Sequence, residues 1–262
     1  MNLILLSILS ITAIGLVCGI ALALAARFFS VQEDPRIETV TELLPGANCG
    51  ACGFAGCAGY AAAIVKDGTP ANRCPSSSSE AAIRIAAVLG IEPVSASARK
   101  VALVLCGGTN TKAPKRFIYD GLIDCAAAAA VGGGDKACTA GCLGYGSCVR
   151  VCPSDAIEVI DGLAHVHPDK CISCGKCVVA CPRGIIHMVP DNRQIHVLCS
   201  SKAPGAAVRK VCSIGCIGCR ICTKLSDGAI TMDGALAVVN YDMPLDNEVV
   251  VEKCPAHCIV KV

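Results

Sequence analysis

The stretch Cys171-Ile-Ser-Cys174-Gly-Lys-Cys177-Val-Val-Ala-Cys181-Pro182 decides how the chain is organised. Its spacing, C-x2-C-x2-C-x3-C-P, is one that ligates [4Fe–4S] clusters. The first three thiolates of such a run bind one cluster, and the cysteine before the proline normally binds another. The run therefore predicts partner cysteines elsewhere, and the stretch that ends in Cys148-Val-Arg-Val-Cys152-Pro153 supplies candidates. Structural zinc is the disfavoured alternative, because zinc usually takes two C-x2-C knuckles.

The composition limits the class of protein. Cysteine makes up 22 of the 262 residues, the net charge is +2, and aromatic residues make up 3% with no Trp. A secreted disulfide scaffold would also be rich in cysteine, but triple C-x2-C-x2-C runs suit a metal cluster better. Thiolate clusters need a reducing compartment, so we expect the cysteine-rich part in the cytoplasm. The near-neutral charge and the few aromatic rings argue against nucleic acid as a partner.

The amino-terminal stretch is predicted to be a membrane anchor. Residues 1–26 carry no charge, and about 39 Å of helix at 1.5 Å per residue can span a bilayer. A secretory signal would need a basic residue before Arg27, and the residues ahead of Cys18 are bulkier than a lipoprotein signal allows. We therefore expect an uncleaved transmembrane anchor over 1–27, with the rest of the chain on the cytoplasmic side.

Residues 28–91 are predicted to form a small domain with its own [4Fe–4S] cluster. Asn48-Cys49-Gly-Ala-Cys52-Gly-Phe-Ala-Gly-Cys57, followed by Cys74-Pro75, gives C-x2-C-x4-C-x16-C-P. The glycines let the backbone turn tightly around a cluster. Zinc is again the alternative. Helices are expected at 35–44, 59–66 and 81–89, and residues 92–134 are expected to form a connecting segment.

An internal repeat follows. Asp135-Lys-Ala-Cys138-Thr-Ala-Gly-Cys142 aligns with Arg209-Lys-Val-Cys212-Ser-Ile-Gly-Cys216, and Val-Leu-Cys occurs twice, ending at Cys106 and Cys199. Both copies continue into a strand, an Asp-Gly turn and a second strand, which is a hairpin signal. We predict an α+β fold: an N-terminal transmembrane helix, a small Fe–S domain, and duplicated bacterial-ferredoxin-like (βαβ) cluster domains. The two-cluster domain covers 135–190, and the domain with one cluster covers 191–262.

The two copies depart from a regular pattern at one position each. In the first copy, Tyr145 stands where the second cysteine of a C-x2-C would be, so Cys138 or Cys142 would have to fill the gap. In the second copy, Ser226 lies near the expected C-P cysteine, and Cys254 before Pro255 is the distant substitute.

These patterns predict about four [4Fe–4S] clusters, within a range of three to five. Site 1 is assigned Cys49, Cys52, Cys57 and Cys74. Site 2 is assigned Cys142, Cys148, Cys181 and Cys138. Site 3 is assigned Cys171, Cys174, Cys177 and Cys152. Site 4 is assigned Cys216, Cys219, Cys222 and Cys254.

Further cysteines lie outside these four sets. Cys106, Cys125, Cys199, Cys212 and Cys258 are additional candidate ligands, whose simpler interpretation is as small buried hydrophobes. Cys106, Cys125, Cys138 and Cys142 could instead form a further cluster, at the expense of site 2. No catalytic residue is predicted, because no histidine neighbours a plausible nucleophile and no nucleotide-binding fingerprint is present.

The order of these motifs resembles the B subunit of the Rnf ion-translocating electron-transport complex, in its longer, cysteine-rich form. The resemblance covers essentially the whole chain, and its most specific parts are the stretch from Cys49 to Cys57 and the closing Cys254-Pro-Ala-His-Cys258. The resemblance directly implies that the cysteines of site 1 and of the run from Cys171 to Cys181 are cluster ligands. The departures at Tyr145 and Ser226 leave the ligand sets of sites 2 and 4 open.

The resemblance implies an electron-transfer subunit in the cytoplasmic (inner) membrane of a bacterium. Its expected partners are soluble ferredoxin as electron donor, the other membrane subunits of the complex, and membrane lipid. The complex would couple electron flow from ferredoxin to NAD with movement of Na⁺ or H⁺, so the chain would belong to a translocase without a substrate-bond-making active site of its own. The alternatives are a structural zinc-binding interaction module, a cluster-based redox sensor, and a membrane-anchored ferredoxin serving another oxidoreductase.

Overall fold

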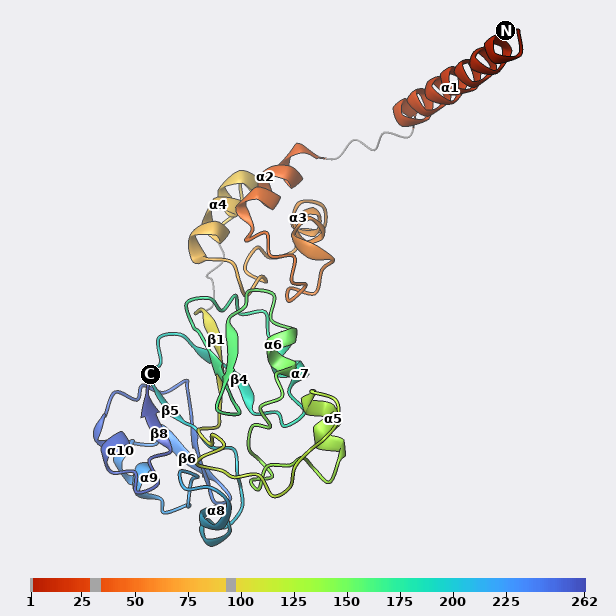
Figure 1. The fold of residues 1–262 in the computed structure, drawn as a ribbon. Helices are drawn as coiled ribbons and strands as arrows, with labels where there is room; N and C mark the ends of the chain where they lie inside the picture. Colours follow the sequence, from red (N-terminus) through yellow and green to blue (C-terminus); the bar gives the residue numbers. More distant parts are fainter. Residues whose placement is uncertain (1, 29–33, 93–97) are drawn as a thin grey trace.

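The computed structural model describes residues 2–28, 34–92 and 98–262 of the chain. Figure 1 shows a separate long helix, a small helical unit, and a larger body of short strands and helices, in chain order. Helix α1 (Asn2–Phe28) is the one helix among the described residues that is long and apolar enough to cross a membrane. The span Leu5–Ala25 buries nothing against the rest of the protein, which leaves its apolar surface available to lipid.

The N-terminal unit, residues 34–92, is a three-helix arrangement. Its helices are α2 (Pro35–Leu43), α3 (Gly56–Asp67) and α4 (Ser79–Leu89). Asp34 and Ser78 cap the starts of α2 and α4 with their side-chain oxygens, and Gly90 ends α4 with a φ of 67°. The core of the unit is formed by apolar side chains from all three helices, among them Val40, Tyr60 and Ile85.

The first ferredoxin-like unit, residues 98–190, contains two antiparallel strand pairs and three short helices. The pairs are β1 (Lys100–Val104) with β4 (Ile186–Pro190), and β2 (Ile157–Ile160) with β3 (Leu163–Val166). The helices are α5 (Cys125–Ala130), α6 (Ser147–Arg150) and α7 (Lys176–Ala180). Because β1 pairs with β4, part of the predicted connecting segment 92–134 is built into this unit.

The second ferredoxin-like unit, residues 191–262, repeats this plan. Its pairs are β5 (Ile195–Val197) with β8 (Ile259–Lys261), and β6 (Ile230–Asp233) with β7 (Leu236–Val239). Its helices are α8 (Gly205–Val211), α9 (Ile221–Leu225) and α10 (Val249–Glu252). Both hairpins that the Asp-Gly pairs predict are formed, and Asp161 and Gly162 adopt the positive φ values of 47° and 70° that such a turn requires.

The register of the sheets confirms the internal repeat in detail. Val104 pairs with Ile186 in the first unit, and Val197 pairs with Ile259 in the second. Directly after each strand, one backbone hydrogen bond recurs: Leu105 N–H donates to Ile185 O at 2.7 Å, and Leu198 N–H donates to Cys258 O at 2.7 Å. The mixed α/β fold with an apolar N-terminal helix and duplicated ferredoxin-like units therefore agrees with the prediction from the sequence.

We expect the core of the N-terminal unit to depend on Ile85. Its side chain is fully buried, so Ile85→Ala should lower the free energy of unfolding of this unit by about 2–5 kcal/mol through lost burial and the cavity left behind. Ile83 lies on the same helix but is 54% exposed, and Ile83→Ala should change the free energy by less than about 0.5 kcal/mol. Anaerobic urea unfolding followed by circular dichroism measures both, and equal effects would contradict the packing described.

Candidate metal-cluster sites

The cysteines gather around cavities. All 22 are free thiols, with no disulfide between them. Among the described residues, no three His, Cys, Asp or Glu side chains converge closely enough to hold a single metal ion. Three cavities are instead each lined by at least four cysteines, and a fourth group of cysteines lies in the N-terminal unit.

Site 1 lies in the loops that flank α3. Burial raises the pKa of the Cys74 thiol, and the neighbouring thiols of Cys52 and Cys49 raise it further. Asn48 closes the first loop because its side-chain oxygen accepts a hydrogen bond from Cys57 N–H at 2.8 Å. A β-carbon on Gly56 would lie 2.8 Å from the same oxygen, so the loop needs glycine there. The structure thus brings the predicted site 1 cysteines into one part of the unit.

The loop before Cys74 is fixed by a buried tyrosine. The Tyr60 hydroxyl donates to Pro70 O at 2.7 Å and accepts from Arg73 N–H at 3.0 Å. Both partners lie within the four residues before Cys74, so Tyr60 on α3 helps to fix where this last cysteine of site 1 lies. Burial raises the pKa of Tyr60, so the hydroxyl keeps its proton for the bond to Pro70.

The four cysteines predicted for site 3 lie together. Cys152, Cys171, Cys174 and Cys177 line one cavity. Burial raises the pKa of Cys177 to about 11, and the thiols of Cys174, Cys171 and Cys152 add to the shift. Ala156 N–H donates to Cys152 Sγ at 3.3 Å, which orients this thiol toward the run that begins at Cys171.

Site 2 contains a cysteine that the spacing did not single out. Cys125, Cys142, Cys148 and Cys181 line one cavity. Burial raises the pKa of Cys148 to about 12, and the thiols of Cys142, Cys125 and Cys181 follow as causes. Cys138, which the sequence analysis assigned to this site, does not line the cavity. Its neighbouring thiols are those of Cys106 and Cys212.

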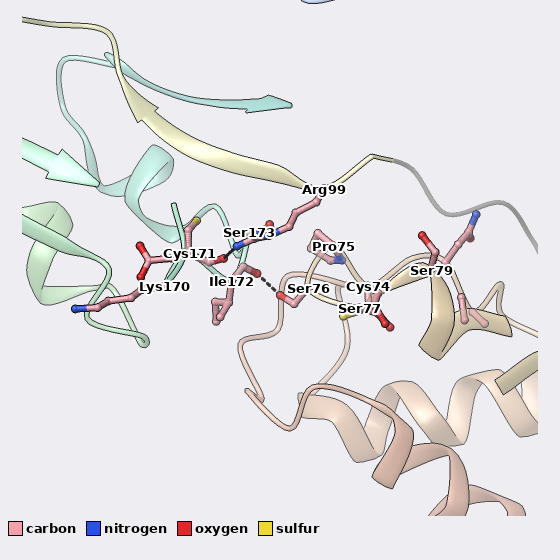
Figure 2. Close-up of a pocket in the computed structure, with 15 residues that line it drawn as sticks. Cys74, Pro75, Ser76, Ser77, Ser79, Arg99, Lys170, Cys171, Ile172 and Ser173 are labelled. Carbon is pink, nitrogen blue, oxygen red and sulfur yellow. Dashed lines mark hydrogen bonds between the residues drawn. The ribbon is translucent and has the colours of Figure 1, made fainter. Parts of the chain in front are cut away.

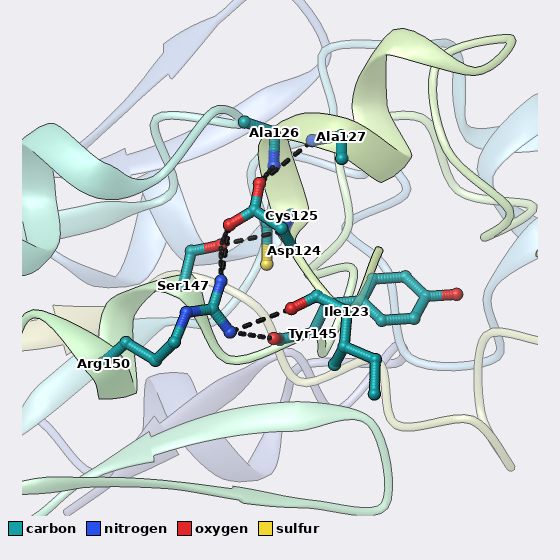
Figure 3. A network of polar contacts seen from close by, with 8 residues as sticks. All are labelled: Ile123, Asp124, Cys125, Ala126, Ala127, Tyr145, Ser147 and Arg150. Carbon is teal, nitrogen blue, oxygen red and sulfur yellow. Dashed lines mark hydrogen bonds and ion pairs between the residues drawn. The ribbon is translucent and has the colours of Figure 1, made fainter. Parts of the chain in front are cut away.

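Figure 3 shows how the chain holds Cys125 in site 2. Asp124 caps α5 and also accepts a hydrogen bond from Ser147 Oγ at 2.7 Å. The same Ser147 oxygen accepts from Cys125 N–H at 2.8 Å. Arg150 pairs with Asp124 and donates to Ile123 O at 2.9 Å. This network joins the segment before α5 to α6, which carries Cys148.

Tyr145 stands in the chain where a regular run would have a cysteine, but its side chain takes part in another contact. Its hydroxyl donates to Asp135 Oδ2 at 2.6 Å. Lys115 Nζ lies 2.8 Å from the same carboxylate oxygen and stacks over the Tyr145 ring. The sequence analysis counted Cys125 among the additional candidate ligands but did not assign it to site 2, because no motif spacing links it to Cys142 and Cys148, and the gap at Tyr145 was the signal for a further ligand.

Site 4 has its four predicted cysteines and one more. Cys216, Cys219, Cys222, Cys254 and Cys258 line one cavity. Cys258 Sγ lies 3.6 Å from Cys254 Sγ, and hydrogen bonding from Cys258 lowers the pKa of Cys254 to about 5. Cys258 is the structural counterpart of Ile185, and both side chains are 2% exposed. We therefore regard Cys258 as a buried neighbour of the four ligands.

The repeat explains why Ser226 can replace a cysteine. Ser226 Oγ accepts from Ile230 N–H at 3.0 Å, as Cys152 Sγ accepts from Ala156 N–H in the first unit. Cys152 belongs to site 3, and the second unit has no run that corresponds to site 3. A serine in this place therefore removes no ligand from site 4, because Cys254 is the counterpart of Cys181.

Sites 1 and 3 face each other across the contact between two units. Figure 2 shows a cavity at this contact, and Cys74 and Cys171 are both among the residues that line it. Ser76 Oγ donates to Ile172 O across this contact, and Arg99 donates to Cys171 O at 3.0 Å. A second cavity at the same contact is lined by residues that include Cys49 and Cys174. The loops of the two sites are therefore adjacent.

Comparison with known proteins agrees with this arrangement. Residues 44–76 match a family model described as a putative Fe-S cluster, and residues 164–187 match one described as a 4Fe-4S binding domain. These matches cover the cysteines of site 1 and the run from Cys171 to Cys181. The chain therefore binds [4Fe–4S] clusters.

Similar proteins of known function cover nearly the whole chain. The chain is 44% identical over 247 residues to the B subunit of the Na(+)-translocating ferredoxin:NAD(+) oxidoreductase complex of Acetobacterium woodii, covering 94% of this chain and 74% of that protein. It is 41% identical over 251 residues to the B subunit of the ion-translocating oxidoreductase complex of Methanosarcina acetivorans, covering 95% and 91%. It is 40% identical over 269 residues to the B subunit of the proton-translocating ferredoxin:NAD(+) oxidoreductase complex of Clostridium ljungdahlii, covering 99% and 93%. With such identity over most of both chains, and with the cysteine sites in place, the chain belongs to the family of B subunits of ion-translocating oxidoreductase complexes.

Proposed function

We propose that the chain is the electron-transfer subunit of a membrane complex that couples electron flow from ferredoxin to NAD with translocation of Na⁺ or H⁺. The observation that carries this proposal is the series of cysteine-lined cavities in a chain that also has an apolar N-terminal helix. Each [4Fe–4S] cluster, when bound, accepts and gives up one electron. The other subunits of the complex are its partners, as the names of the related proteins state for those proteins.

We propose four ligand sets, which the geometry supports. Sites 1, 3 and 4 keep the sets that the spacing predicts, and site 2 exchanges Cys138 for Cys125. The sets are Cys49, Cys52, Cys57 and Cys74 for site 1; Cys125, Cys142, Cys148 and Cys181 for site 2; Cys152, Cys171, Cys174 and Cys177 for site 3; and Cys216, Cys219, Cys222 and Cys254 for site 4.

The cavities fit a cluster better than a zinc ion. Four thiolates that share one zinc lie about 2.3 Å from a single point, which leaves no space between them. In sites 2, 3 and 4 at least four cysteines line each cavity, yet no three His, Cys, Asp or Glu side chains among the described residues converge closely enough to hold a single metal ion. This is the reason to prefer an electron-transfer protein to a structural zinc-binding module. A free-standing ferredoxin is less well supported, because the relatives that cover the whole chain are named as subunits of complexes.

The protein supplies ligands, burial and hydrogen bonds, and the redox chemistry belongs to the bound clusters. In this proposal the chain has no substrate-bond-making site of its own and acts in the translocase as a relay. Soluble ferredoxin is the proposed electron donor. Site 1 lies in the N-terminal unit and site 4 in the second ferredoxin-like unit, with the first ferredoxin-like unit between them, which would give the relay a direction in space (Figure 1).

We further propose that α1 anchors the protein in the cytoplasmic membrane of a bacterium, with all cluster sites on the cytoplasmic side. The apolar span Leu5–Ala25 is the support for the anchor, and Arg27 at its end supports the orientation. Free cysteines in such number also suit a reducing compartment.

Replacing Cys125 tests the revised membership of site 2. Cys125→Ser should remove one cluster, which lowers the iron content of anaerobically purified protein by about four atoms per chain. Adding Tyr145→Cys to that variant should restore the iron, because it recreates the regular C-x2-C-x2-C run that the second unit has at Cys216, Cys219 and Cys222. Iron and acid-labile sulfide analysis measures both. Unchanged iron in Cys125→Ser would rule Cys125 out as a ligand.

Removing α1 tests the anchor. A chain without residues 2–28 should move from the membrane fraction to the soluble fraction and keep its iron, because no described cluster site includes α1. For the orientation, alkaline phosphatase fused after Val262 should be inactive, whereas a fluorescent protein at the same position should fluoresce. An active phosphatase fusion would show that the orientation proposed here is wrong.

A further inference from the structure

Four cysteines remain that no site described above uses, and the internal repeat relates them in pairs. Cys106 and Cys199 each follow the last residue of β1 or β5 by two positions. Cys138 and Cys212 each precede, by four positions, the first cysteine of their unit's cluster run. Each ferredoxin-like unit thus contributes the same two cysteines, in the same places of the same fold.

Reciprocal hydrogen bonds hold the loops of Cys106 and Cys199 together. Gly107 N–H donates to Leu198 O at 3.1 Å, and Ser200 Oγ donates to Leu105 O at 2.8 Å. In each contact, the residue after one cysteine bonds to the residue before the other. The two loops therefore pack directly against each other.

Cys138 and Cys212 reach the same place. A β-carbon built on Gly108 would lie 3.6 Å from both Cys106 Sγ and Cys212 Sγ, so these two sulfurs are within about 7 Å of each other. Ser213 N–H donates to Lys112 O at 2.9 Å, which holds the turn after Cys212 against the first unit. Cys138, Cys212 and Ala113 form a small buried cluster of their own.

The thiols influence one another across the junction. Burial raises the pKa of Cys138, and the thiols of Cys106 and Cys212 are further causes of the increase. Burial raises the pKa of Cys199 to about 11, and the thiols of Cys216 and Cys138 contribute. Each of the four sulfurs therefore has at least one of the others as a neighbour, across the boundary between the units.

The surroundings provide what a buried anionic cluster requires. Gly108 N–H and Cys142 N–H donate to Cys106 Sγ at 3.4 and 3.5 Å. Cys216 N–H donates to Cys199 Sγ at 3.3 Å, which is the same contact in the other unit. Lys136 is 1% exposed, and its ammonium group donates to Gly108 O at 2.6 Å. Backbone N–H groups and a buried positive charge stabilise thiolates that share a cluster.

We propose that Cys106, Cys138, Cys199 and Cys212 ligate a fifth [4Fe–4S] cluster at the junction of the two ferredoxin-like units. The proposal rests on the proposed function, because it assumes that the other sites hold clusters. It differs from the alternative raised by the sequence, which drew Cys106, Cys125, Cys138 and Cys142 together. Cys125 and Cys142 belong to site 2, and Cys199 and Cys212 from the second copy take their places.

A cluster at this junction would lie between sites 2 and 4. Cys106 Sγ accepts a hydrogen bond from the backbone of Cys142, a site 2 cysteine. Cys199 Sγ accepts one from the backbone of Cys216, a site 4 cysteine. The junction cluster would accept one electron from one neighbour and pass one to the other, so it needs no further reactant. With this site, 20 of the 22 cysteines have a role, and Cys18 in α1 and Cys258 are the two that remain.

Metal analysis of the full-length protein, purified without oxygen, tests the proposal directly. We expect about 20 iron atoms and as many sulfides per chain, and about 16 irons in each of the variants Cys138→Ser and Cys212→Ser. Cys18→Ser is the matched control and should keep the wild-type content, because this cysteine lies in α1. Mössbauer spectra of the two variants should lose one fifth of the [4Fe–4S] intensity and keep the rest.

Other results would overturn the proposal. A wild-type count of about 16 irons, unchanged in both variants, would mean that the four cysteines are buried thiols, while the four-cluster function would stand. About 16 irons with one zinc per chain that Cys212→Ser removes would make the junction a zinc site. Wild-type protein without iron would overturn both the junction cluster and the proposed function. If either variant is too unstable to purify, the wild-type count of 20 or 16 decides alone.

Discussion

The pairing of β1 with β4, and of β5 with β8, is the constraint on which the cysteine sites depend. In each unit, the C-P cysteine lies five residues before the strand that returns to the sheet: Cys181 before Ile186, and Cys254 before Ile259. The opposite strand leads within two residues into Cys106 or Cys199. A strand pair with fixed register therefore holds two cysteines of distant sequence position at set places, while the local run supplies the others from a tight turn.

Local spacing was enough to group the cysteines of each run, and not enough to group cysteines that only long-range packing brings together. The runs at Cys171 and Cys216 determine the shape of their own turns, and the family and the fold expected from them agree with the comparisons and with the structure. Cys125 has no such signature. Its position depends on the contacts of Asp124 with Ser147 and Arg150, and the sequence gives no spacing rule for a contact between a cap residue and a helix twenty-six residues away.

The assignment of Cys138 to site 2 is a second example of the limit of local spacing. Its spacing to Cys142 made it a reasonable candidate for site 2, and only the packing of one repeat copy on the other shows that it points elsewhere. The alignment of the copies did contain the relevant information, because it already matched Cys138 with Cys212 and Cys106 with Cys199. What the alignment could not show is that the two copies meet at these residues, since a repeat does not specify how its members dock.

Cys258 makes site 4 differ from site 2, its counterpart in the first ferredoxin-like unit. In the first unit, the position beside site 2 is the hydrocarbon side chain of Ile185, and in the second unit it is a thiol within 3.6 Å of Cys254 Sγ. Hydrogen bonds to ligand sulfur are one of the means by which a protein raises the reduction potential of an iron–sulfur centre. The exchange of this one buried side chain would therefore give site 4 a higher reduction potential than site 2. Two sites built on the same fold would then differ in the free energy of the electron that each one holds.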